Sequence, residues 1–148
     1  MKLEKVVEIV KFKQVVNERA EYHGYQIKSP EDAANILMKE IGSEDREVFM
    51  VIVLNTKNKV TAIHRCHVGS INASIVHPRE VMKSAIRNNG ASIVVGHNHP
   101  SYDPTPSKED IEVTKRLAEA GRILGIELLD HIIVSNKTFI SLKEKGYL

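Results

Sequence analysis

His97, His99 and Asp110 are the residues whose types and spacing point most clearly to chemistry. The two histidines are separated by one residue and directly follow the apolar run ASIVVG at 91–96. If the chain stays extended there, both imidazoles point to the same side, because alternate side chains of a strand share a face. Two imidazoles and one carboxylate offer three ligands to a divalent metal. They leave a coordination position for water, which is typical of a catalytic zinc site.

Asp110 has a second explanation, as part of a helix cap. Ser107-x-x-Asp110 is close to a capping box, in which two side chains bind backbone N–H groups at a helix start. Asp110 would then only hold backbone in place. The two interpretations are compatible, because a helix start fixes the direction of an acidic side chain. The loop before the helix contains Pro100, Pro104 and Pro106, which limit its flexibility and can return the helix start to the histidines.

The elements that must position these residues alternate between strand and helix patterns. Capping signals and apolar spacing predict three helices: between Ser29 and Gly42, between His77 and Gly90, and over 107–125. Apolar and β-branched runs predict strands over 5–17, 48–54, 60–68, 72–76, 91–96, 126–135 and 138–142. Turns at 55–59 and 136–137 make two connections hairpins. We therefore expect an α/β fold of the α+β kind, with a mixed sheet flanked by helices.

Length and composition indicate one ordinary globular domain. The chain has 148 residues, which we divide into an N-terminal extension (1–28) and a main domain (29–148). The formal charge is only +2, so composition gives little sign of a nucleic-acid footprint. The single cysteine permits no internal disulfide and fits a reducing cytoplasm. The longest apolar run, 48–54, is far too short to cross a membrane, so we expect no membrane contact. The oligomeric state is not fixed by the sequence.

Other histidines are expected to have structural roles. His64, Cys66 and His67 have the residue types of metal ligands. Strand alternation separates them, however, with His64 and Cys66 on one face and His67 on the other. His131 lies in the apolar run LLDHIIV and is expected to be a hydrogen-bonded core histidine rather than a ligand. Its neighbour Asp130 is expected to face the opposite side, toward solvent or the surroundings of the site.

The segment GHNHPSYDPTPSKED resembles the JAMM/MPN+ signature H-x-H-x(7)-S-x-x-D. The matching residues are His97, His99, Ser107 and Asp110. The flanking sequence is similar to the RadC-like JAB domain of bacteria and mobile elements, over roughly residues 29–148. The resemblance implies a JAB/MPN domain, of the cytidine-deaminase-like architecture.

The resemblance also implies a zinc site and an activity. It places one zinc ion per chain on the two histidines and the aspartate. It places a general-base glutamate at the start of an upstream strand, which matches Glu47, with Glu44 as the reserve. Ser107 would then hydrogen-bond the oxyanion of the substrate. The implied function is zinc-dependent hydrolysis of peptide or isopeptide bonds in a peptide or protein substrate. The alternatives are a RadC-type DNA repair or recombination accessory without peptidase activity, a binding module with structural zinc, and a non-haem iron site.

This sequence departs from the family pattern in two places. Tyr102 stands where RadC-like chains usually have glycine, which we expect to reshape the rim of the site. Longer RadC proteins carry an N-terminal helix-hairpin-helix module that binds DNA, and residues 1–28 are too short for it. DNA binding is therefore not inherited with the resemblance, and we expect nucleic-acid binding to be weak at most.

Overall fold

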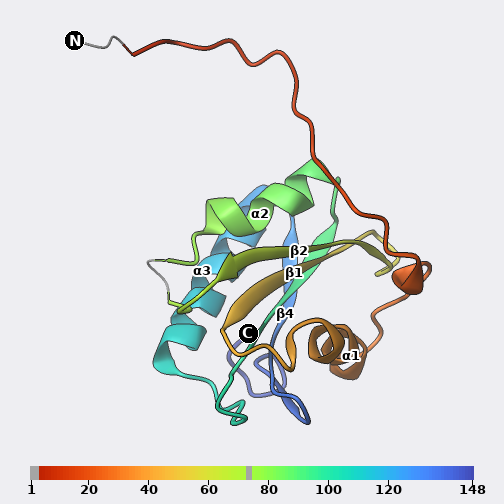
Figure 1. Ribbon diagram of the computed structural model, residues 1–148, viewed down its shortest axis with the longest axis vertical. Helices are drawn as coiled ribbons and strands as arrows, with labels where there is room; N and C mark the ends of the chain where they lie inside the picture. Colours follow the sequence, from red (N-terminus) through yellow and green to blue (C-terminus); the bar gives the residue numbers. More distant parts are fainter. Residues whose placement is uncertain (1–3, 73–74) are drawn as a thin grey trace.

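The computed structural model describes residues 4–72 and 75–148. Within them the chain forms a mixed sheet with helices on both faces (Figure 1). The helices are the short 3-10 turn η1 (Ala20–Tyr22), α1 (Pro30–Ile41), α2 (Pro78–Arg87) and α3 (Lys108–Leu124). The strands are β1 (Val48–Leu54), β2 (Val60–Val68), β3 (Ser92–Asn98), β4 (Glu127–Val134) and β5 (Phe139–Ser141). The expected α/β fold with a mixed sheet is confirmed.

The order of the strands places β3 at the centre of the sheet. The five strands run β2-β1-β3-β4-β5. β1 is antiparallel to β2 and β3, β3 is parallel to β4, and β4 is antiparallel to β5. Helix α3 supplies the crossover that the parallel pair needs. Both predicted hairpins are present. The carboxyl end of β3, where the two histidines lie, is therefore bordered by β1 and β4.

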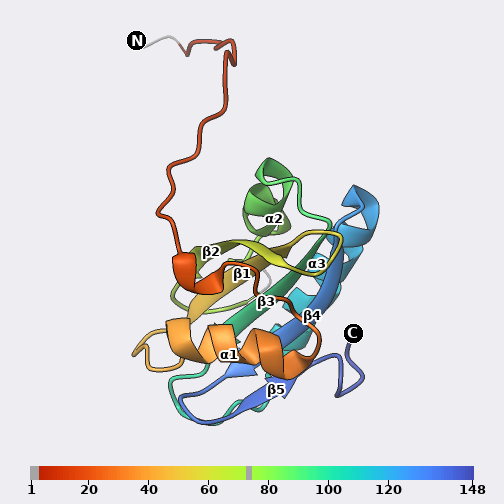
Figure 2. The same ribbon diagram turned by 90° about the vertical axis from the view of Figure 1, so that its right-hand side faces the viewer.

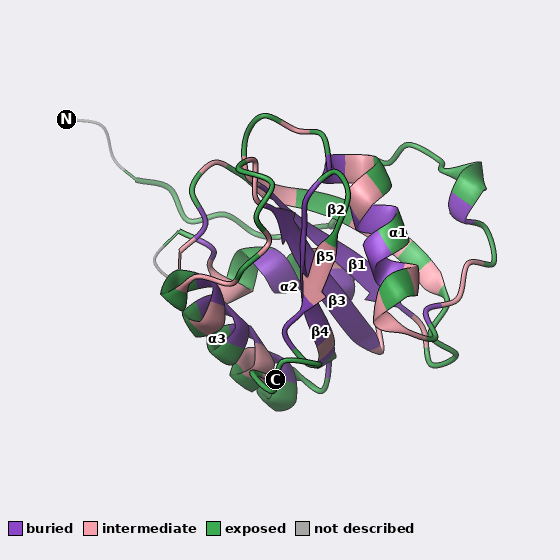
Figure 3. Cartoon of the chain, turned by 90° about the horizontal axis from the view of Figure 1, so that it is seen from below, coloured by how far each residue is buried: buried purple, intermediate pink, exposed green. Residues whose placement is uncertain are grey.

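The central strands are buried on both faces because helices cover both sides of the sheet (Figure 3). Met50 and Ile52 of β1 belong to the core cluster under α1. Ile93 and Val95 of β3 belong to the cluster under α2 and α3. The two-residue period of a strand then puts His97 on the face covered by α2 and α3.

The N-terminal strand predicted over 5–17 is wrong. Residues 4–19 form neither helix nor strand and run away from the sheet (Figures 1 and 2). The apolar residues occur mostly as adjacent pairs, so no single face of a strand could bury them. They are exposed instead: Val6, Val7, Ile9, Val10, Phe12, Val15 and Val16. Residues 25–27, in contrast, lie along the start of β2, where Val60 N donates to Tyr25 O at 2.9 Å.

The second strand that the structure does not support is the one predicted over 72–76. Residues 73–74 lie outside the described residues. The remainder forms a turn, with Ile75 N and Val76 N both donating to Asn72 O. Short runs of β-branched residues are ambiguous when no partner strand is identified.

The helices begin and end close to the predicted positions, with different capping details. The side chain of Ser29 makes no capping hydrogen bond, and its carbonyl accepts from Asp32 N instead. His77 caps α2 as expected, since its Nδ1 accepts from Arg79 N at 3.3 Å. Gly125 ends α3 at φ 74°, in the left-handed region that favours glycine. No helix in 4–72 or 75–148 is long and apolar enough to span a membrane.

Candidate metal centre

The end of β3 and the start of α3 bring two histidines and one aspartate together. Asn98 is the last residue of β3, and the backbone remains extended beyond it, since His99 N donates to Val134 O at 2.9 Å. His97 and His99 therefore share a face of the sheet. Asp110 lies in the first turn of α3, on the same face.

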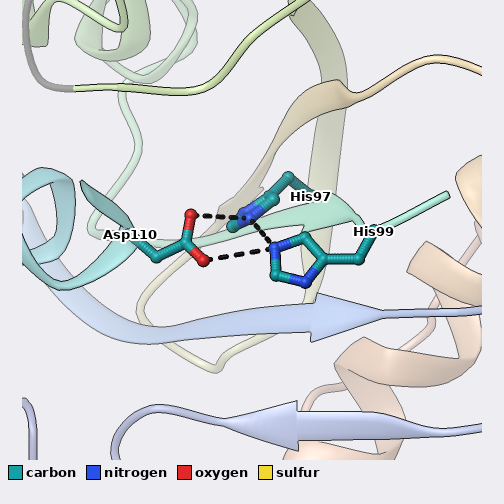
Figure 4. A group of neighbouring side chains, drawn as sticks. All are labelled: His97, His99 and Asp110. Carbon is teal, nitrogen blue, oxygen red and sulfur yellow. Dashed lines mark hydrogen bonds and ion pairs between the residues drawn. The ribbon is translucent and has the colours of Figure 1, made fainter. Parts of the chain in front are cut away.

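The three side chains converge through their ligand atoms (Figure 4). The Nε2 atoms of His97 and His99 are 3.1 Å apart. His97 Nε2 is 3.0 Å from Asp110 Oδ1, and His99 Nε2 is 3.2 Å from Asp110 Oδ2. Donors held at about 2.0–2.1 Å from a tetrahedral zinc ion lie about 3.3 Å from one another. These residues thus fit a metal ion, and among the described residues they form the one His/Cys/Asp/Glu group that does.

The outer nitrogen of each imidazole is also engaged. His99 Nδ1 lies 2.9 Å from the carbonyl oxygen of Asp103, and His97 Nδ1 lies 2.8 Å from His131 Nε2. A carbonyl can only accept, so His99 donates from Nδ1 and its neutral form has a lone pair on Nε2. Hydrogen bonds of this kind orient the histidines of metal sites.

The buried carboxylate of Asp110 dominates the electrostatics of the site. Burial alone would raise the pKa of Asp110, but hydrogen bonds from His97 and His99 outweigh it and hold that pKa well below its ordinary value. The hydrogen bond to Asp110 raises the pKa of His99, and the charge of Glu47 contributes in the same direction. Because positive charge is favoured beside this buried carboxylate, a metal cation suits the site electrostatically.

The structure shows the capping box and leaves the carboxylate of Asp110 placed so that it could also bind a metal. Asp110 N donates to Ser107 Oγ at 3.1 Å, and Ser107 N donates to Asp110 Oδ2 at 2.8 Å, which completes the capping box. The same Oδ2 faces His99, and Oδ1 faces His97. The cap holds the carboxylate in the orientation in which it meets both imidazoles.

Replacing Asp110 with asparagine separates these two roles. Asparagine keeps a side-chain oxygen that can accept from Ser107 N, so the metal-free protein should lose little stability. It lacks the negative charge, so zinc affinity should fall by more than the roughly 10–100-fold typical of an outer-shell change. Chelator competition and melting curves with and without zinc measure both effects. Equal shifts of the two melting temperatures would favour capping alone.

Glu47 directly precedes β1 and lies on the same face of the sheet. Phe49 pairs with His97 in the antiparallel register, so Glu47 comes opposite His99. Its Oε2 accepts from Ile71 N at 2.9 Å, which fixes the carboxylate. Glu44 is held elsewhere, in an ion pair with Arg65 at 3.2 Å. Of the two glutamates, Glu47 is the one that the sheet directs toward the histidines.

The sequence is similar to known proteins along most of its length. The sequence model of the RadC-like JAB domain matches residues 27–147. The chain belongs to the RadC-like JAB domain family. A UPF0758 protein of Geobacillus sp. strain WCH70 is 59% identical over 131 residues, which cover 88% of this chain and 58% of that protein.

Other bacteria carry similar proteins. A UPF0758 protein of Caldanaerobacter subterraneus is 58% identical over 123 residues, covering 83% of this chain and 53% of its own length. One from Halalkalibacterium halodurans is 56% identical over 124 residues, covering 84% and 53% respectively. The chain thus spans little more than half the length of the curated relatives that it matches.

Tyr102 adopts a backbone conformation in this JAB domain that glycine would adopt more easily. Its φ is 68°, in the left-handed region, and its N–H closes a turn by donating to His99 O at 3.1 Å. That region costs a residue with a Cβ roughly 1–2 kcal/mol, whereas glycine enters it freely. The tyrosine side chain is exposed.

The remaining candidates are separate from the metal centre. His64, Cys66 and His67 form no potential metal group, and burial raises the pKa of the Cys66 thiol to about 12. Asp130 does not face solvent, which was one of the two surroundings expected for it. It is buried and accepts from Ser141 Oγ at 2.5 Å and from Lys143 N at 3.1 Å, which ties β4 to the C-terminal segment.

His131 is a buried, hydrogen-bonded core histidine, as predicted, but it is bonded to the site. Desolvation lowers its pKa well below the ordinary value, so the imidazole is neutral. Its two nitrogens contact His97 and Thr114. Thr114 was missed in the sequence. It lies one helical turn after Asp110, and that spacing is the only signal in the sequence that could have found it.

Proposed function

We propose that this JAB domain is a zinc-dependent hydrolase of peptide or isopeptide bonds, with one zinc ion per chain. The observation that carries the proposal is the convergence of His97, His99 and Asp110 through ligand atoms 3.0–3.2 Å apart. Three protein donors leave a position open, which distinguishes catalytic from closed structural sites. A fourth functional group, Glu47, directly precedes β1 on the same face.

The chain's own residues divide the work of hydrolysis. When bound, zinc would lower the pKa of the water it holds toward ~7 and polarise the scissile carbonyl. Glu47 would accept the proton of the attacking water and pass it to the leaving amine. Ser107 already accepts from Asp110 N, so its hydroxyl proton remains to donate to the oxygen that becomes negative. A donor of that kind typically contributes about 10²–10³-fold in rate.

The test is a metal-dependent activity screen. Purified protein, stripped of metal and then reloaded with zinc, is offered peptides and isopeptide conjugates, with Glu47→Ala as the inactive control. Hydrolysis that requires both zinc and Glu47 supports the proposal. Zinc binding without hydrolysis of any conjugate would favour a binding module with structural zinc. If iron and not zinc restored the activity, the proposed metal would be iron.

DNA binding is expected to be weak, salt-sensitive and independent of sequence. With 21 basic and 19 acidic residues, the net charge is only +2, so the overall attraction to phosphates is weak. The affinity should therefore fall with a shallow slope as salt rises. Fluorescence anisotropy of labelled duplex and single-stranded DNA across a salt series measures this. Tight binding at physiological salt would favour the DNA repair accessory function instead.

The compartment that we propose is the cytoplasm. Cys66 is the single cysteine of the sequence, so the chain forms no internal disulfide and fits a reducing compartment.

A further inference from the structure

A chain of hydrogen bonds connects the main chain of Asp110 to the outer nitrogen of His97. Thr114 Oγ1 donates to the carbonyl oxygen of Asp110 at 2.8 Å. The same Oγ1 lies 2.6 Å from His131 Nδ1, and His131 Nε2 lies 2.8 Å from His97 Nδ1. The side chains come from α3, β4 and β3, and Thr114, His131 and His97 are all fully buried. Water therefore cannot substitute for any partner.

The direction of each bond follows from the number of protons available. A threonine hydroxyl has one proton, and Thr114 gives it to a carbonyl, which can only accept. Thr114 Oγ1 must then accept from His131 Nδ1–H. His131 is fully buried, and its two nitrogens contact a hydroxyl and an imidazole rather than a carboxylate, so a second ring proton would be an uncompensated buried charge. Its Nε2 therefore accepts from His97 Nδ1–H. With its Nδ1 protonated, His97 has Nε2 as the nitrogen that can bind a metal.

The ring of His97 presents this nitrogen to the rest of the metal group. Its Nε2 lies 3.1 Å from His99 Nε2 and 3.0 Å from Asp110 Oδ1. The hydrogen-bond chain from Asp110 O through Thr114 and His131 to His97 is called the relay below. Phe49 packs against both of its imidazoles: it stacks on His97 at 14° between ring planes and meets His131 edge-on at 68°. Rotation of either imidazole would break a hydrogen bond and collide with Phe49.

We propose that Thr114 and His131 are positioning residues that hold His97 in the tautomer required for metal binding. This inference rests on the proposed metal site and extends it beyond the three ligands. The relay begins at the main chain of Asp110 and ends at the imidazole that faces the side chain of Asp110. One residue thereby sets both the position of a carboxylate ligand and the tautomer of a histidine ligand.

The decisive variant is Thr114→Val, which keeps the shape of the side chain and removes the hydroxyl. His131 Nδ1–H then has no acceptor, so His131 should carry its proton on Nε2 and donate to His97. Zinc affinity, measured by chelator competition, should fall about 10–100-fold, the usual effect of losing an outer-shell partner. The ¹⁵N shifts of the histidine rings in the zinc-free protein should show the change of tautomer in His131 and His97.

Two further variants separate positioning from general structural damage. Thr114→Ser retains the hydroxyl and should restore both the affinity and the wild-type ¹⁵N pattern. Thr56→Val, in the exposed turn at 55–59, should change neither. A wild-type protein with the His131 proton on Nε2 would overturn the inference even if Thr114→Val failed to fold. So would wild-type zinc affinity in Thr114→Val.

The proposed hydrolase function and the relay can fail separately. If the wild-type protein binds zinc without hydrolysing any substrate, the function fails, and affinity and tautomer still test the relay. If the wild-type protein binds no zinc, the metal site fails, and the ¹⁵N pattern of the zinc-free wild type and Thr114→Val proteins still decides whether the relay has the direction that we propose.

Discussion

Replacing Glu47 with glutamine should lower hydrolysis about 10²–10⁴-fold and leave zinc in place. Glutamine is nearly isosteric, and its amide oxygen can still accept from Ile71 N, so the local structure should be retained. It cannot take up a proton at neutral pH, so the attacking water would lose its base. Since Glu47 is not among the three donors, zinc content and melting temperature should barely change. Initial rates, elemental analysis and melting curves measure the three quantities.

Glu44→Gln is the matched control for this prediction. Glu44 lies three residues earlier and is paired with Arg65, so its loss should leave the rate near that of the wild type. Loss of zinc in Glu47→Gln would show that Glu47 is itself a ligand. Full activity in Glu47→Gln, with a large loss in Glu44→Gln, would transfer the role of base to Glu44.

Replacing His97 and His99 together with alanine should reduce the zinc content from about one ion per chain to none. The double variant removes two of three donors, and Asp110 alone is a poor site for a metal that prefers four ligands. Elemental analysis after gel filtration gives the stoichiometry directly. The fold should persist, because β3 is held by β1 and β4 along its whole length.

His64→Ala with His67→Ala is the corresponding control, since it also removes two histidines that lie close together in one strand, here β2. The structure places neither in the metal group, so this variant should keep its zinc. Zinc retained by the His97 and His99 double variant would move the site elsewhere in the chain. Iron in place of zinc in the wild-type protein would change the identity of the metal.

The parts of the fold that could be predicted are those in which local pattern and burial agree. The apolar runs of β1 and β3 are buried on both faces, and the capping signals of α2 and α3 lie at the true helix starts. The segment 5–17 has the β-branched residues of a strand but no partner strand in the sheet. Composition shows that a segment could form a strand, but it does not show whether a partner strand is present.

The candidate site divides in the same way. The H-x-H spacing at a strand end, the proline-containing loop and the capping box indicated that His97, His99 and Asp110 could meet, and the resemblance identified them as a zinc site. Glu47 came from the resemblance, since an acid at a strand start carries no signal of its own. The contact between His131 and His97 depends on the register of β3 and β4, in which Val95 pairs with His131. No local pattern encodes that register.

The three proposed metal donors lie in one short stretch of chain, from the end of β3 to the first turn of α3, whereas the proposed base directly precedes β1. Metal binding and proton transfer are therefore encoded in separate parts of the gene. A single codon change at position 47 would give a protein with the same fold and the same metal but no hydrolysis. Such a protein could persist as a sensor or scaffold, and the H-x-H signature alone would not distinguish it from an enzyme. Surveys of this family should sort sequences by the residue at the start of β1.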